Sequence, residues 1–171
     1  MTAAQASDEF GEPATERLIL RPLTAEHVAA VTSGRRLPEW APGYPSNGDR
    51  GIAELLERQG VPTGPDVAFG RRLVVERQTG QVVGGIGLKG PPTEGRVELG
   101  YGIVESRRAR GYATEAVRAM AALAFTLPGV TTLVAGVDPA NRASVRVLEK
   151  AGFVFEAQGG NESWYVLAPT S

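Results

Sequence analysis

Residues 97–125 constrain the fold most, because two different hydrophobic periodicities follow each other there. From Val97 to Ile103, every second residue is apolar or aromatic, and the residues between are polar or glycine. After a loop with three arginines, apolar residues recur at positions 113, 116, 117, 120, 123, 124 and 127, which is a helical spacing. The segment therefore predicts a strand, a short basic loop and a long helix.

The second face of this predicted strand carries Glu98, Gly100 and Gly102. Two glycines inside a strand commonly mark a bulge or a place where a ligand lies against the backbone. We therefore expect a bare groove that contains one carboxylate.

The loop and the start of the helix predict an anion-binding site. Gly111 and Ala113 keep bulky side chains away from the first helical N–H groups, which lack intrahelical partners. The helix dipole favours negative charge at the same point, and Arg107, Arg108 and Arg110 surround it. A phosphate or pyrophosphate is the expected ligand. An ordinary solvated turn is the alternative interpretation of the arginines.

These residues also carry a family resemblance. Arg108-x-x-Gly111-x-Ala113, between a strand and a helix, resembles the Arg/Gln-x-x-Gly-x-Gly/Ala acetyl-CoA motif of the GNAT N-acetyltransferases. Residues 141–153 resemble the Asn-x-x-Ser-x-x-x-Leu-Glu-Lys-x-Gly-Phe segment of that family. The sequences ELGY and GYATEA are similar to the RimJ/RimL branch, which acetylates protein N-termini. The resemblance extends from about residue 18 to residue 166.

Composition excludes several other classes of site. The chain has 171 residues, a formal net charge of -1, no cysteine and one histidine. Disulfides, thiolate metal sites and a cysteine nucleophile are therefore excluded, and a histidine-dependent triad or metal site would depend on His27 alone. We expect no metal and no nucleic-acid partner. Without a signal-peptide pattern or an apolar run of the ~18 residues that a membrane span needs, we expect a cytoplasmic protein that does not bind membranes.

The pattern along the chain predicts one domain over residues 15–171 after a disordered tail at residues 1–14. The expected order is β-α-α-β-β-β-α-β-α-β-β, an α/β (mixed α+β) fold. Strands are expected at 18–20, 72–77, 81–89, 97–103, 131–137, 153–157 and 163–166, and helices at 24–32, 50–59, 113–127 and 142–150. The GNAT resemblance implies a mixed, mostly antiparallel sheet of six to seven strands with helices on both faces.

Two features receive a simple structural interpretation. Gly85-x-Gly87-x-x-Gly90 formally matches a dinucleotide fingerprint, but prolines and another strand follow it instead of a helix, which disfavours an NAD site. His27 is expected on the surface of the first helix.

The resemblance implies acetyl-CoA as co-substrate and a splay between the 97–103 and 131–137 strands that admits its pantetheine arm. The backbone of Ile103 and Val104 is expected to contact pantetheine. The coenzyme residues implied in the loop and helices are Arg108, Ala109, Arg110, Gly111, Tyr112, Ala113, Thr114 and Asn141. Asn141 has a second interpretation as a helix N-cap.

Without a cysteine to carry the acyl group, direct attack of an amine on the thioester is the simplest mechanism. Glu98 is the candidate base, and a structural carboxylate is its alternative role. The usual family tyrosine is replaced by Leu148, so the resemblance to the RimL-like branch implies Ser144 as the proton donor. Ser144 can equally serve as a hydrogen-bond partner of the helix backbone.

The acceptor is the least constrained part. Trp40, Tyr44 and Asp49 are expected to wall the acceptor side, although the two aromatic residues can equally pin their loop to the core. A protein N-terminal α-amine is the expected acceptor. A small amine such as an antibiotic or polyamine, and a non-catalytic acyl-CoA sensor, are the alternatives. A homodimer is left open.

Overall fold

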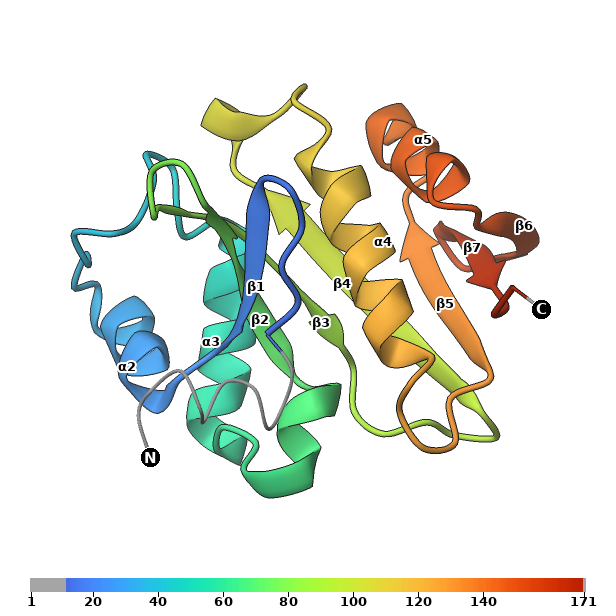
Figure 1. The fold of residues 1–171 in the computed structure, drawn as a ribbon, viewed down its shortest axis with the longest axis horizontal. Helices are drawn as coiled ribbons and strands as arrows, with labels where there is room; N and C mark the ends of the chain where they lie inside the picture. The colour runs from blue at the N-terminus through green and yellow to red at the C-terminus, as the bar shows by residue number, and fades with distance from the viewer. Residues whose placement is uncertain (1–11, 171) are drawn as a thin grey trace.

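The computed structural model describes residues 12–170, which form one seven-stranded sheet with helices on both faces (Figure 1). The order in the sheet is β1-β2-β3-β4-β5-β7-β6. The strands are β1 (Leu18–Pro22), β2 (Arg71–Glu76), β3 (Val82–Leu88), β4 (Arg96–Ile103), β5 (Thr132–Val137), β6 (Val154–Gly159) and β7 (Glu162–Leu167). Every neighbouring pair is antiparallel except β4 and β5, so the predicted mixed sheet is confirmed.

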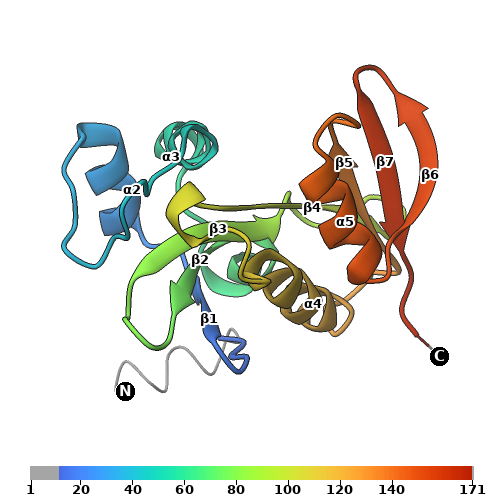
Figure 2. The same cartoon turned by 90° about the horizontal axis from the view of Figure 1, so that it is seen from above.

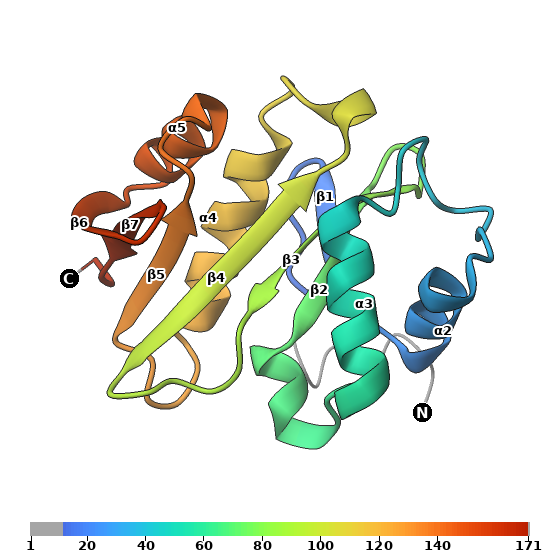
Figure 3. The ribbon, with the colours of Figure 1, turned by 180° about the vertical axis from the view of Figure 1, so that it is seen from behind.

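The helices cover the sheet unevenly. Figure 2 shows α2 (Ala25–Ser33) and α3 (Asn47–Gln59) on one face and α4 (Tyr112–Ala124) on the other. Seen from behind in Figure 3, α3 lies over β2 and α4 lies behind β4. The last helix, α5 (Arg142–Lys150), packs against α4. Two 3-10 helices, η1 (Gly64–Phe69) and η2 (Glu105–Arg107), occupy segments predicted as loops.

Side-chain caps set where the helices begin. Thr24 accepts a hydrogen bond from the His27 N–H and caps α2, which starts one residue after the start of the predicted 24–32 helix. Ser46 and Asp49 form a capping box, so α3 begins at Asn47 rather than at the predicted Arg50. A capping box satisfies two otherwise unpaired N–H groups, which is why the helix extends back into the preceding loop.

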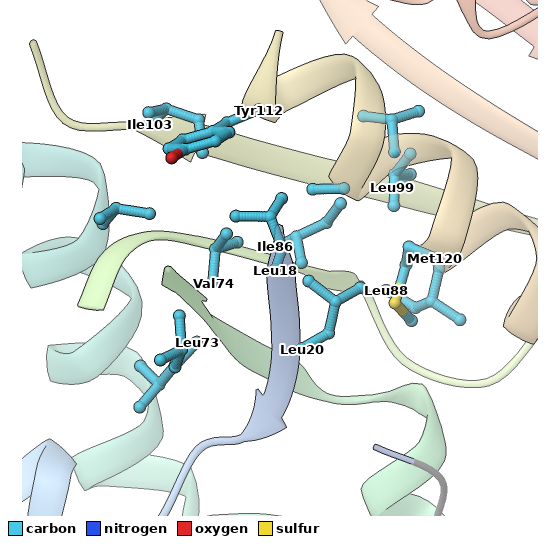
Figure 4. Packing of buried hydrophobic residues seen from close by; sticks show 14 of the residues in the cluster. Leu18, Leu20, Leu73, Val74, Ile86, Leu88, Leu99, Ile103, Tyr112 and Met120 are labelled. Atoms are coloured by element: carbon cyan, nitrogen blue, oxygen red, sulfur yellow. The ribbon is translucent and has the colours of Figure 1, made fainter. Parts of the chain in front are cut away.

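The hydrophobic core packs on both faces of the sheet, and Figure 4 shows part of it, including Met120 of α4 and Ile86 and Leu88 of β3. Val117 and Met120 of α4 are fully buried, and they face a β3 strand in which all seven residues are buried. The Gly85-x-Gly87 segment therefore belongs to a central strand and not to a phosphate-binding turn.

Part of the segment predicted as a disordered tail, residues 1–14, is placed by the structure. Pro13 and Ala14 run beside β1, where the Leu20 N–H donates to Pro13 O at 2.9 Å and Ala14 bridges to Ile19. Residues 1–11 lie outside the described part of the chain. Within residues 12–170, no helix has the length and apolar character needed to cross a membrane.

Candidate active site

β4 and β5 pair only near their N-terminal ends and then separate. The parallel register joins Arg96 to Thr132 and ends with Glu98 opposite Val134, although β4 continues to Ile103. A cavity of about 540 Å³ lies beyond, lined by the end of β4, the arginine loop, the start of α4 and one side of α5. The splay implied by the family resemblance is therefore present.

The backbone of β4 is divided between two neighbours. The Val104 N–H donates to Val83 O at 2.9 Å and so points toward β3. Since alternate residues of a strand direct their backbone groups to opposite sides, those of Leu99, Tyr101 and Ile103 point toward the β5 side, where pairing has ended. Ile103 therefore faces the cavity as expected, whereas the N–H of Val104 is already engaged.

The start of α4 forms a cradle at the open end of the cavity. Gly111 has φ 81° and precedes the helix without a side-chain cap, so the first N–H groups of α4 are not covered by a capping side chain. Ala109 is also in the left-handed region, with φ 61°. Arg108 folds back and donates from Nε to Ile103 O at 2.9 Å, which joins the cradle to β4.

A buried carboxylate lies behind the cradle. Glu76 of β2 is 3% exposed and accepts hydrogen bonds from Tyr112 Oη at 2.5 Å and Thr79 Oγ1 at 2.7 Å. Arg107 Nε and Arg110 Nη1 lie 3.5 and 3.8 Å from Glu76 Oε2. Burial raises the pKa of Glu76, but these hydrogen bonds and two arginines outweigh it, and the pKa lies below its ordinary value. Glu76 is therefore an ionised anchor for the cradle loop.

Arg17 supports the cradle from the N-terminal side. Its guanidinium lies 4.7 Å from the centre of the Tyr112 ring and donates to Arg110 O at 2.7 Å. Its Nε lies 2.9 Å from Glu115 Oε1, and Glu115 also accepts a bond from Thr15. The loop is thus held by residues far away in the sequence.

The deep part of the cavity contains a hydroxyl pair. Tyr101 Oη of β4 lies 2.6 Å from Ser144 Oγ of α5, and both residues line the cavity. Asn141 Oδ1 accepts from the Ser144 N–H at 3.2 Å, so Asn141 caps α5 while it also lines the cavity. Leu148 is 1% exposed and belongs to the core.

A split between two parallel strands, filled by a cavity that ends at an uncapped helix, matches a known family. The model of the acetyltransferase (GNAT) domain matches residues 17–154, which is most of the chain. This chain is a GNAT acetyltransferase.

Relatives and solved structures agree with this assignment. A Bacillus subtilis relative, the uncharacterized N-acetyltransferase YjdG, is 28% identical over 121 residues, or 66% of this chain and 71% of that protein. A crystal structure of an acetyltransferase from Agrobacterium tumefaciens is 27% identical, with a TM-score of 0.66, and the match covers 93% of this chain and 95% of that one.

Two more distant structures have the same fold. RimL, a ribosomal L7/L12 α-N-protein acetyltransferase in complex with coenzyme A, has 17% identity and a TM-score of 0.62, with 91% of this chain and 96% of that chain covered. AAC(6')-Ib in complex with ribostamycin and coenzyme A has 20% identity and a TM-score of 0.62, with 90% and 94% covered.

Most residues implied for the coenzyme lie together in the acetyltransferase cavity. These are Ile103, Arg108, Ala109, Gly111, Tyr112, Ala113, Thr114 and Asn141, and Ser144 lies with them. Val104 and Arg110 do not line it: Val104 is buried toward β3, and Arg110 extends toward Glu76. Sequence reasoning missed Tyr101, Arg146 and Lys150, which also line the cavity. The four-residue spacing of the last two on α5 was the available signal.

Glu98 lies on the other face of β4. Its Oε1 is 2.6 Å from Lys89 Nζ, and the Glu98 side chain is 30% exposed. Only part of the expected bare groove is open: a Cβ placed on Gly102 would meet nothing within 4 Å, whereas one on Gly100 would contact the side chains of Lys89 and Arg71.

The neighbouring strand completes a four-glycine floor, defined by Gly85, Gly87, Gly100 and Gly102. Gly85 pairs with Gly102 and Gly87 pairs with Gly100 across β3 and β4. The Arg71 guanidinium lies directly against this floor. A Cβ on Gly85 would come within 2.7 Å of Arg71 Nη2, so a larger residue would not fit there. Its Nη1 donates to Gly100 O at 3.2 Å, so Arg71 ties β2 to the groove strand.

The residues expected to wall the acceptor side are buried. Trp40 and Tyr44 are 4% and 3% exposed, and Asp49 is 8% exposed in an ion pair of 3.2 Å with Arg71. The expectation that His27 lies on the helix surface is wrong. His27 is 4% exposed, its Nε2 lies 2.8 Å from Tyr44 Oη, and its ring packs 5.2 Å from Trp40. The loop aromatics thus pin the loop to the core, and His27 completes their cluster.

Proposed function

We propose that this acetyltransferase transfers the acetyl group of acetyl-CoA directly to a primary amine, with the α-amine of a protein or peptide N-terminus as the acceptor. The observation that carries the proposal is the single cavity that runs from the uncapped start of α4 along the split edge of β4. A long ligand with an anionic end and a thin polar arm fits that combination.

The cradle binds the diphosphate in this proposal. The N–H groups at Gly111 to Thr114 and the side chain of Arg108 supply hydrogen bonds and positive charge. The pantetheine arm bonds to the β5-facing backbone groups of β4, including those of Ile103. Asn141 contacts the arm from α5. These contacts orient the thioester, which is the main source of rate in a direct transfer.

Glu98 is the proposed base, acting directly or through a water from the glycine face of β4. An α-amine has a pKa of about 7.7–8.0, so a large fraction is already neutral near pH 7.5 and the base removes a proton only as the new bond forms.

The ELGY and GYATEA sequences and the fold shared with RimL support a protein N-terminus as acceptor. The fold shared with AAC(6')-Ib supports a second candidate, a small-molecule amine. Both acceptors require the same binding of acetyl-CoA in the cavity. They differ only in the residues that they contact on the α2–α3 side.

A thiol-release assay with acetyl-CoA tests the proposal. We expect release that depends on an added peptide with a free N-terminus and that is absent with the same peptide blocked at its N-terminus. Thiol release with aminoglycosides or polyamines but not with peptides would show that the acceptor is a small-molecule amine and not a protein N-terminus. Tight coenzyme binding without acceptor-dependent release from any amine would identify a non-catalytic sensor instead.

A further inference from the structure

The deep end of the coenzyme cavity contains a tyrosine for which the sequence motifs provide no role. Of the three β4 residues that line the cavity, Tyr101 lies farthest from the cradle and nearest to the point where β4 and β5 begin to separate. An arm that enters from the cradle places its far end there. The reacting sulfur of the proposed co-substrate is that far end, so Tyr101 and Ser144 are the hydroxyls nearest to it.

The two hydroxyls differ in acidity, and this sets the direction of their hydrogen bond. A phenol with an ordinary pKa of 10 is a far stronger donor than an aliphatic alcohol. This acidity favours donation from Tyr101 Oη to Ser144 Oγ, 2.6 Å away, over donation to Ser144 O, 3.3 Å away. The serine hydrogen is then free to point into the cavity, and a hydroxyl that accepts one bond donates a second one more strongly.

We infer that Tyr101 is a positioning residue that directs the Ser144 hydroxyl at the departing thiolate, a role that rests on the proposed function. The amine attacks the acetyl carbon, and the carbon–sulfur bond breaks with its electron pair on sulfur. The proton lost by the amine goes to Glu98, and the sulfur accepts a hydrogen bond from Ser144.

The pair stabilises the thiolate by hydrogen bonding and does not transfer a proton to it. A thiol has a pKa of about 8.5, whereas burial raises the pKa of Tyr101 above 10, so transfer from the phenol to the thiolate is uphill. The released thiolate takes its proton from water. Leu148, which replaces the usual family tyrosine, is buried in the core. In this arrangement Ser144 supplies the hydroxyl at the sulfur instead, and Tyr101 of the sheet orients it.

A double-mutant cycle tests the inference. Ser144→Ala removes a hydrogen bond to a charged group, and we expect kcat to fall about 10- to 100-fold. Tyr101→Phe keeps the ring and leaves the serine hydroxyl undirected, and we expect a fall of about 10-fold. The double variant should be no slower than Ser144→Ala alone, because Tyr101 acts only through Ser144. KM for acetyl-CoA should stay within about twofold in all three, since the lost bond forms with the leaving group.

Two further variants serve as controls. Tyr165→Phe removes another buried phenol hydroxyl, on β7 and outside the cavity lining, and should keep wild-type kcat. Ser144→Thr keeps a hydroxyl and should retain most of the turnover, so the comparison of threonine with alanine remains decisive even if Tyr101→Phe does not fold.

Wild-type kcat in Tyr101→Phe would overturn the inference, as would losses that multiply in the double variant. Wild-type kcat in Ser144→Ala would also overturn it. The proposed function fails differently: acetyl-CoA then does not bind to the wild-type protein, or no amine stimulates thiol release.

Discussion

The two faces of β4 differ in how completely the protein fills them. On the α4–α5 face, a cavity of about 540 Å³ remains open beside the split edge of the strand. On the α2–α3 face, the cavity under α3 has a volume of only about 10 Å³, and its lining includes His27, Tyr44, Asp49 and Arg71. The side proposed to bind the coenzyme therefore already contains an open cavity. The side proposed to bind the acceptor is filled by this polar cluster, whereas Glu98 and Gly102 of β4 are partly exposed.

Glycine serves opposite purposes on these faces. Gly111 leaves helix N–H groups uncovered for a ligand, while Gly85 makes room for the protein's own Arg71. A glycine-rich strand therefore does not by itself indicate a ligand. What decides its purpose is the group that occupies the space above it, and that group comes from a distant part of the chain.

The largest expected effect is on catalysis at the rim of the acceptor side. Glu98→Gln should lower kcat by about 10²- to 10⁴-fold, because the amide cannot accept a proton from the attacking amine. KM for acetyl-CoA should change little, since Glu98 is on the other face of β4. Steady-state kinetics with Glu54→Gln on exposed α3 as the matched control would check this, and near-normal turnover in Glu98→Gln would remove it from the mechanism.

Asp49→Ala should destabilise the fold by about 3–5 kcal/mol, because it leaves the Arg71 side chain, which is only 14% exposed, without its carboxylate partner and also removes the α3 capping box. Urea denaturation measures the loss. The affinity of the remaining folded protein for acetyl-CoA should equal that of the wild type. A loss of less than about 1 kcal/mol would show that the acceptor side is not held by this ion pair.

Arg108→Glu should raise KM for acetyl-CoA about 10- to 100-fold, the equivalent of a lost charged hydrogen bond, and should change KM for the amine far less. Arg58→Glu on α3 makes the same charge change away from the cavity and should leave both constants unchanged. A larger effect on the amine constant than on the coenzyme constant would mean that the cradle binds something other than the diphosphate.

The smallest expected effect is a difference in acid sensitivity between the two faces. Burial lowers the pKa of His27 below 6.5, so the unfolded chain binds a proton that the folded chain does not, and stability falls as the pH drops below about 6.5. The slope cannot exceed about 1.4 kcal/mol per pH unit for one group. His27 is the only histidine of the chain, so His27→Gln should flatten the curve between pH 6.5 and 5.

Glu76, on the coenzyme side, titrates in a lower range. The pKa of Glu76 is lowered below 4.5, so its contribution to the stability of the fold is complete above pH 4.5. That contribution is lost only as the pH falls through the lowered pKa. Urea unfolding at a series of pH values should therefore show Glu76→Gln differing in slope from the wild type only below about pH 4.5. If the free energy of unfolding changed with pH equally in His27→Gln and in the wild type between pH 6.5 and 5, His27 would not be the group that titrates in that range.

Local patterns were sufficient for much of the molecule. The strand and helix at 97–125 and the helix after Asn141 occur close to the predicted positions. The cradle was also predictable, because its N–H groups, small residues and Arg108 are contiguous in the sequence. The errors concern residues whose surroundings are distant: His27 was expected to be exposed because its neighbours in sequence do not include Tyr44 and Trp40.

The sequence by itself determined the order of strands and helices, the start of α4 and the small residues and arginines of the cradle, since these depend on backbone preferences and side-chain spacing over a few residues. Only the tertiary structure decided that Tyr101 meets Ser144, that Glu76 anchors the arginine loop and that Arg71 fills the glycine floor. Each of these contacts joins residues separated by about 30 to 45 positions, and their formation depends on how the strands pair and which face each helix covers.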